Sequence, residues 1–221
     1  MTARFSNFAL DRYVGPEAST LDEVDIPDMS NEHHQSGYWV VNHFLNITLR
    51  ERFNPPLNAY AHTYLRRANA AFVEHEAARE ATLAFVESDR QAVAKYSLAI
   101  THWEYFLGQA WQGYSVLRSM LGELSGERPK LFEKHDGSTE QRLNSLHNAM
   151  KHAESRIEDG QIIEGAVSPV WLGKEGLRST DTLLTYGETA DILGDLATWA
   201  DVLVDPRETA DKLRALPADD D

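Results

Sequence analysis

The chain has 221 residues, of which 35 are acidic and 21 are Lys or Arg, so its formal net charge is −14 with histidine counted as neutral. It contains no cysteine, which excludes disulfides, thiolate metal sites and thiol nucleophiles. The charge disfavours a protein that coats nucleic acids or anionic membranes with its whole surface, but it is compatible with a local basic patch.

The amino terminus, MTARFSNFALDRYVG, contains charged residues early and no unbroken apolar run. Elsewhere, no uncharged apolar stretch approaches the roughly 20 residues that a membrane span needs. We therefore expect a cytoplasmic protein that does not enter a membrane.

Residues 1–35 mix prolines, glycine and scattered charges without helical periodicity, and we expect them to form an arm that wraps a bundle. Apolar residues then recur at helical spacing from Tyr38 to Phe53, where Asn54 and two prolines would end the helix. Residues 36–221 are expected to form a single helical-bundle domain.

Two long central helices are predicted next. Residues 57–87 contain no Pro or Gly and many alanines, which favour helix. Ser88-Asp-Arg-Gln91 has the spacing of a capping box, which would open a second helix running to about Leu124. Gly108 and Gly113 within it suggest that another helix packs closely there.

After a polar connection, Ser138-Thr-Glu-Gln141 offers a second capping box, and a helix is predicted over about 139–157. Residues 160–182 lack a helical period. We expect them to form an irregular insertion or a small hairpin at one end of the bundle.

Two further caps follow. Thr185-Tyr-Gly-Glu188 would open a helix through about Leu203, and Asp205-Pro206-Arg-Glu208 would open a last one. The sequence therefore predicts an all-α fold, a bundle of four to six helices with two long central helices.

The predicted helix over 139–157 has an unusual polar face. At about 100° per residue, its apolar side chains gather on one side: Leu143, Leu146, Ala149, Met150, Ala153 and Ile157. The other side holds Asn144, His147, Asn148, Lys151, His152 and Ser155. Side chains four residues apart lie one above the other, so these imidazoles and amides would share a surface. A solvated face and a functional site are both open interpretations.

The string Arg142-Leu-Asn-Ser-Leu-His147-Asn148-Ala-Met-Lys151-His152 resembles the late-helix motif of HEPN domains. These are four-helix-bundle proteins whose ribonuclease members carry Arg, then commonly Asn or another polar residue, then His after four to six intervening residues. Two alignments are open. In one, Asn148 and His152 match the family's Asn and His, and His147 stands in place of the Arg. In the other, Arg142 and His147 match the Arg and His, and Leu143 replaces the polar residue.

The resemblance implies metal-independent RNA cleavage in a site formed across a homodimer, in a stress or defence system. An imidazole can transfer protons near neutral pH, while a guanidinium stays charged and binds phosphate oxygens. Arg142, His147 and His152 are therefore the candidate catalytic residues. Asn144, Asn148 and Lys151 are candidate binding residues for RNA or a nucleotide phosphate. Because neither alignment is complete, a catalytically degenerate member is expected.

No metal or other cofactor is expected, because the sequence lacks the paired Glu-x-x-His motifs of di-iron bundles and has no histidines four residues apart. His102 and Glu104 lie in an apolar stretch and suggest a different possibility, a small-molecule enzyme with a pocket inside the bundle.

Three functions thus remain: a HEPN-like domain that binds RNA or a nucleotide, a noncatalytic module or dimer that contacts a protein partner, and a small-molecule enzyme. A continuous positive field over residues 142–156 would favour the first, and a surface that stays acidic would favour the second. Buried His and Glu side chains that converge would favour the third.

Overall fold

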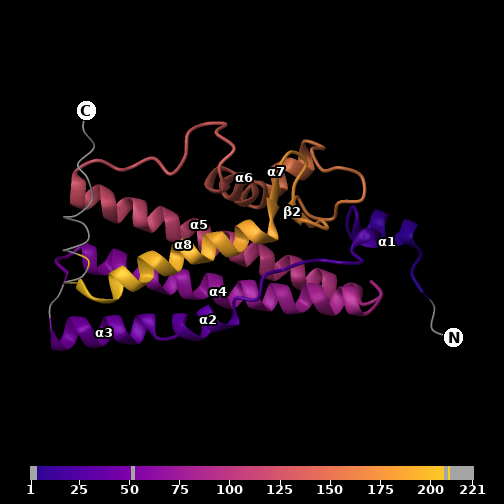
Figure 1. Cartoon of the computed structure of the whole chain (residues 1–221). Coiled ribbons are helices and arrows are strands. Elements are labelled where there is room, and N and C mark those ends of the chain that lie inside the picture. The colour runs from indigo at the N-terminus through magenta and orange to yellow at the C-terminus, as the bar shows by residue number, and fades with distance from the viewer. Residues whose placement is uncertain (1–3, 51–52, 207–208, 210–221) are drawn as a thin grey trace.

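Two long helices, α4 (Leu57–Glu87) and α5 (Val93–Ser125), form the centre of the computed structural model, which describes residues 4–50, 53–206 and 209 (Figure 1). They are joined by a short connection and pack against each other along their length. The prediction of an all-α bundle with two long central helices is confirmed.

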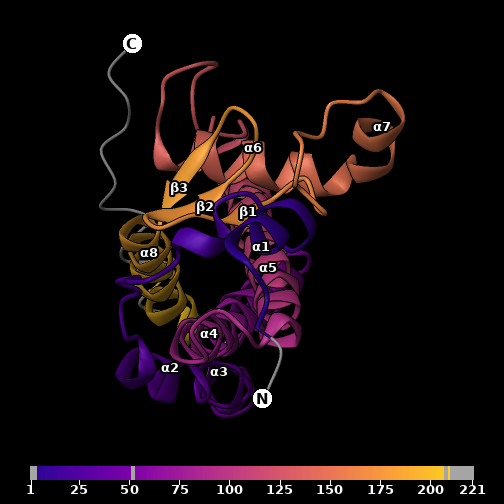
Figure 2. The ribbon, with the colours of Figure 1, turned by 90° about the vertical axis from the view of Figure 1, so that its right-hand side faces the viewer.

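Several further helices pack against this pair, among them α6 (Thr139–Lys151), which lies on α5. α8 (Tyr186–Val204) contacts both long helices, and α3 (Trp39–Leu49) contacts α4 and α8. α2 (Ser30–Ser36) lies on α4 next to α3. Viewed along the bundle, α2 and α3 lie beyond α4, on the side opposite the small β-sheet (Figure 2).

Small residues explain how closely the helices approach. The buried side of α4 is rich in alanine, at Ala61, Ala68, Ala71, Ala78 and Ala81. A Cβ added at Gly113 of α5 would lie 3.0 Å from Leu196 Cδ2 of α8, whereas nothing lies within 4 Å of such an atom at Gly108. The expectation of close packing is therefore confirmed at Gly113 and wrong at Gly108.

The amino-terminal region is more helical than the sequence suggested. It contains α1 (Asn7–Tyr13) and a 3₁₀ turn, η1 (Ala18–Thr20), before α2. The Ser6 hydroxyl caps α1 by accepting from the Ala9 amide. Each element is only one or two turns long, so none is long enough to show sustained periodicity.

The predicted helix over 139–157 is broken in two. α6 (Thr139–Lys151) begins at the Ser138 cap, whose hydroxyl accepts from the Gln141 amide at 3.2 Å. His152 interrupts the helix, and α7 (Ala153–Glu158) follows. Three members of the predicted apolar stripe, Leu143, Leu146 and Ala149, are buried, but Ile157 beyond the break is 59% exposed.

The insertion after α7 forms a small antiparallel sheet of β1 (Trp171–Leu172), β2 (Gly176–Arg178) and β3 (Leu183–Thr185), in that order. This agrees with the hairpin that the sequence predicted. A Cβ at Gly176 would lie 2.0 Å from the Leu184 carbonyl oxygen, so the tight pairing of β2 with β3 needs glycine there. β3 leads directly into α8.

The four predicted caps differ in outcome. Thr185 and Glu188 form the complete capping box of α8. Ser88 instead ends α4, and its hydroxyl donates to the Phe85 carbonyl, while α5 begins only at Val93. The predicted cap at 205–208 includes positions outside the described residues.

Candidate functional site

The six predicted site residues fall into two groups on α6. Arg142, Asn144, His147 and Asn148 are half-buried, whereas Lys151 and His152 are exposed at the end of the helix. Arg142 and His147 are five positions apart, which turns their side chains about 140° from each other. Arg142 and His147 therefore contact different parts of the bundle.

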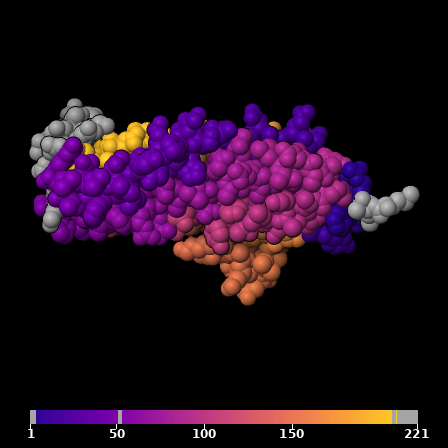
Figure 3. All heavy atoms as spheres, turned by 90° about the horizontal axis from the view of Figure 1, so that it is seen from below, coloured from indigo at the N-terminus to yellow at the C-terminus, as the bar shows by residue number. Residues whose placement is uncertain are grey.

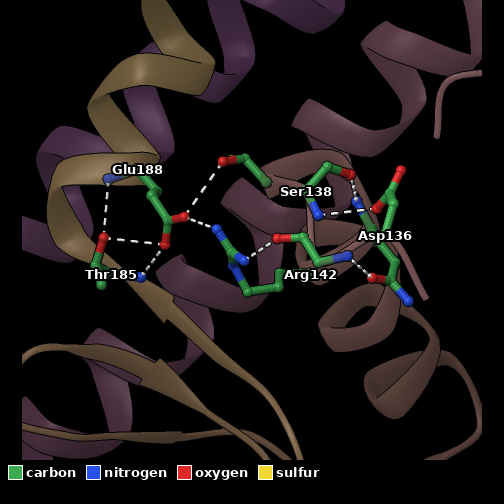
Figure 4. Close-up of polar contacts among 8 residues, drawn as sticks. Asp136, Ser138, Arg142, Thr185 and Glu188 are labelled. Carbon is green, nitrogen blue, oxygen red and sulfur yellow. Dashed lines mark hydrogen bonds and ion pairs between the residues drawn. The ribbon is translucent and has the colours of Figure 1, made fainter. Parts of the chain in front are cut away.

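Arg142 is held by the start of α8 (Figure 4). Its guanidinium forms an ion pair with Glu188 and also donates to the carbonyl oxygen of Gly137. Glu188 in turn accepts from the Thr185 amide at 2.8 Å and from the Thr139 hydroxyl at 3.2 Å. The guanidinium that the HEPN resemblance would direct to a phosphate is thus bound within the chain.

The protonation of Glu188 reflects this network. Burial alone would raise the pKa of its carboxyl, but hydrogen bonds from Thr185 and the ion pair with Arg142 outweigh burial and leave the pKa below its ordinary value. The carboxylate stays ionised at neutral pH and keeps the guanidinium paired. The network joins the amino-terminal turns of α6 and α8.

His147 packs against α5 through Trp111, with the two ring centroids 6.0 Å apart. Its Nδ1 atom is buried and has no hydrogen-bond partner among the described residues. Burial lowers the pKa of His147, and the nearby charges of Lys151 and His152 lower it further. The imidazole is therefore neutral at neutral pH.

The amides form a local pair, in which Asn148 Nδ2 donates to Asn144 Oδ1 at 3.2 Å. The two residues are four apart, so helical geometry places one above the other. His152 lies at the helix break, where its carbonyl accepts from the Arg156 amide at 3.0 Å. Of the six predicted site residues, Lys151 and His152 are therefore the ones whose side chains are most accessible.

The charge around α6 and α7 is mixed. Exposed acids lie at Glu154, Glu158, Asp159 and Glu164, close in sequence to Lys151 and Arg156. The segment that follows α6, which includes α7, projects from the body of the molecule (Figure 3). A continuous positive surface, the feature that would favour binding to RNA, is not formed by these residues.

His102 and Glu104 do not form a pair. His102 Nδ1 lies 2.7 Å from Glu74 Oε2 of α4, whereas Glu104 accepts from the Ser168 hydroxyl at 2.9 Å. Burial raises the pKa of the Glu104 carboxyl. Residues two apart on a helix point in different directions, which explains why these side chains have separate partners. The two side chains therefore do not converge as the proposed enzyme pocket would require.

His75 is a buried histidine that the sequence does not distinguish from the others. Its ring contacts the rings of Trp103 and Phe106, with centroid distances of 5.2 and 5.5 Å. The Thr189 hydroxyl donates to the Tyr186 carbonyl, so His75 must donate to Thr189 through Nε2, 3.2 Å away. Burial lowers the pKa of His75 to about 4, which makes it a neutral core residue.

The described residues contain no group of three or more His, Cys, Asp or Glu side chains placed to hold a metal ion. Over the same part of the chain, no helix is long and apolar enough to cross a lipid bilayer.

A second candidate surface, which is apolar and exposed, lies on α3. The helix buries Trp39 and His43, which bind α8: the indole donates to Asp201 Oδ1 at 2.8 Å, and His43 Nδ1 lies 3.1 Å from the Leu203 carbonyl oxygen. The opposite side exposes five large apolar side chains, which we call the α3 face: Tyr38, Val41, Phe44, Leu45 and Leu49. They span roughly 140° of the helix.

The sequence predicted the apolar periodicity of this helix but not that much of it faces outward. A hollow of about 320 Å³ lies beside the α3 face, lined by Gln35, Tyr38, Trp39, Asn42, Asp201 and Val204. The stretch from His33 to Leu49 contains no Asp, Glu, Lys or Arg. The absence of charge from this stretch is the feature of the sequence that indicates an exposed apolar surface.

Comparisons with known proteins do not decide between these surfaces. No protein-family model matches the chain, and no match is found among curated proteins or among solved structures. The resemblance to HEPN domains stays a prediction.

Proposed function

We propose that the chain is a noncatalytic protein-interaction module whose contact surface is the α3 face. The observation that carries the proposal is an exposed apolar stripe without charge on a chain of net charge −14. Exposed apolar patches of a few hundred Å² commonly mark interaction sites.

The size of the α3 face supports this function. Leu49 is 75% exposed and Phe44 is 60% exposed, and the other three members are about half exposed. Together the five side chains expose on the order of 500 Å². At about 25 cal/mol per Å², burying this area contributes on the order of 10 kcal/mol before the costs of association are subtracted.

The contacts of α6 support a noncatalytic interpretation. The Arg142 guanidinium is paired with Glu188, and the His147 ring is half-buried against Trp111. An RNA phosphate would have to compete with a carboxylate for Arg142 and approach a surface of mixed charge. A degenerate HEPN-like fold is compatible with this proposal.

The proposal can be tested in the cells that naturally make the chain. A photo-crosslinking benzophenone side chain is placed at Phe44 or, as a matched control, at Tyr105 of α5, which is 56% exposed. We expect a discrete protein crosslink at position 44 and none at position 105. The crosslinked protein is identified by mass spectrometry and purified.

The affinity of the crosslinked protein for the purified chain is then measured by titration. We expect the double variant Val41→Glu, Leu45→Glu to bind at least tenfold more weakly, because two buried charges would oppose the contact. If position 44 yields no crosslinked protein, or if the charged variant binds as well as the unaltered chain, the proposal is wrong.

A further inference from the structure

We infer that the protein bound at the α3 face is a second copy of the same chain, with the two α3 helices packed antiparallel about a twofold axis. This inference rests on the proposed function and names its partner. Three features of the described residues carry it: the charge distribution, the anchoring of α3 and the shape of the α3 face.

The charge distribution favours self-contact at this place. Two copies that each carry a net charge of −14 repel each other wherever acidic surfaces meet. The segment from His33 to Leu49 is the longest stretch of the sequence without Asp, Glu, Lys or Arg. Contact through α3 therefore brings the fewest like charges together.

The position and rigidity of α3 leave its face accessible. α3 lies at the edge of the bundle, with α4 and α8 on its inner side (Figures 1 and 2). Seen from that edge, the violet surface of α2 and α3 is open (Figure 3). Bonds from Trp39 and His43 to α8 fix the helix from behind. A surface held in place loses little conformational entropy on binding.

A twofold contact uses the same patch on both copies. The exposed area of the α3 face, counted twice, amounts to about 1,000 Å², the lower limit for a specific interface. The rim formed by α2 adds to this area. The interface is therefore at the small end of the range for stable dimers.

The alignment of the two helices follows from the two ends of the α3 face, Tyr38 and Leu49. Complete overlap of two antiparallel stripes running from Tyr38 to Leu49 places the axis between residues 43 and 44. Leu49 of one copy then lies opposite Tyr38 of the other, beside the hollow of about 320 Å³. This space accommodates a leucine side chain, and the twofold symmetry fills both hollows. A parallel arrangement would place hollow against hollow.

Oligomeric state is the first test. We expect sedimentation velocity of the purified chain to show a dimer at micromolar concentration. The variant Val41→Glu, Leu45→Glu should be monomeric at the same concentration, while the matched surface variant Tyr105→Glu should remain dimeric. Circular dichroism of all three should be alike, because the changed side chains are exposed.

The absence of cysteine makes the register testable by disulfide formation. In the antiparallel arrangement, the two copies of position 45 lie about 4.5 Å apart along the helix axes, within disulfide reach, whereas the two copies of position 49 lie about 16 Å apart. Leu45→Cys alone should therefore crosslink under mild oxidation, and Leu49→Cys alone should not. Mixing Tyr38→Cys with Leu49→Cys chains should give a mixed disulfide.

The outcomes separate the two proposals. A dimer that crosslinks through Leu49→Cys alone would overturn the antiparallel register and leave the α3 face as a contact surface. A monomer at 100 µM, with Phe44 crosslinked to a different protein in cells, would overturn self-association and leave the interaction function. A monomer in which position 44 crosslinks only within its own chain would overturn both.

Discussion

α6 and α3 lie on opposite sides of the bundle and use their side chains in opposite ways (Figure 2). α6 attaches to the bundle through Leu143 and Leu146, and its Arg142 side chain is bound to Glu188 of α8. α3 attaches through Trp39 and His43, which are buried and also bond to α8, while the five apolar side chains of the α3 face point outward. The chemical type of a side chain therefore does not tell whether it is available. Its partners do.

The largest expected effect contrasts the two helices directly. Leu143→Ala should lower the free energy of unfolding by about 3 kcal/mol, since it removes a fully buried side chain and leaves a cavity. Leu45→Ala on α3 should change it by less than about 0.5 kcal/mol when it is measured at a concentration low enough for any dimer to dissociate. Urea unfolding followed by circular dichroism measures both. Equal losses would mean that the α3 face is covered within the monomer.

The next largest effect on the free energy of unfolding is expected at the buried imidazole of His75. His75 has a pKa of about 4 in the folded chain and an ordinary value near 6.5 when unfolded. Between these values only the unfolded chain binds the proton, so stability falls as the pH is lowered from 6.5 to 4, by about 3 kcal/mol for this group.

Urea unfolding of the unaltered chain and of His75→Gln across this pH range measures the contribution. Other groups titrate in both proteins, so the difference between the two pH profiles isolates His75. The unaltered chain should lose stability more steeply towards pH 4. Parallel profiles would mean that the ring is solvated or charged in the folded state.

A smaller effect on the free energy of unfolding is expected at the ion pair between Arg142 and Glu188, which lies in the predicted site. Arg142→Gln removes the partly buried ion pair with Glu188 and should cost about 1–2 kcal/mol in the free energy of unfolding. Lys151→Gln, which changes an exposed cation on the same helix, should stay within about 0.5 kcal/mol. A larger loss at Lys151 would contradict the division of α6 into bound and free groups.

The smallest expected effect is on RNA. Unstructured RNA incubated near neutral pH should remain intact with the unaltered chain and equally with the double variant His147→Ala, His152→Ala, as gel electrophoresis would measure. The reason is that Arg142 is bound to Glu188. Cleavage by the unaltered chain that the variant loses would restore the ribonuclease hypothesis and contradict the noncatalytic proposal.

Local signals predicted much of the fold. The span of α4 follows from its alanines and lack of Pro or Gly, and the caps at Ser138 and Thr185 are formed as their spacing indicated. The break at His152 has no comparable signal, because no Pro or Gly lies there. Ser88 resembles a helix start in sequence, yet its hydroxyl closes the preceding helix.

The site was harder to predict, because its geometry depends on distant partners. The sequence shows that Asn144 and Asn148 are four residues apart, a spacing that brings two side chains together within one helix. It did not indicate that Glu188, 46 residues away, would bind Arg142. Periodicity likewise predicted an apolar stripe after Tyr38, but the direction of that stripe depends on bonds to the far end of α8.

Those bonds also set an order of events during synthesis. Trp39 and Asp201 are 162 residues apart, and His43 and Leu203 are 160 apart. A growing chain emerges from the ribosome with α3 long before its attachment points on α8 exist, while the adjacent α4 and α5 can already pair. The two bonds that fix α3 therefore form only after α8 has been translated, 160 to 162 residues later.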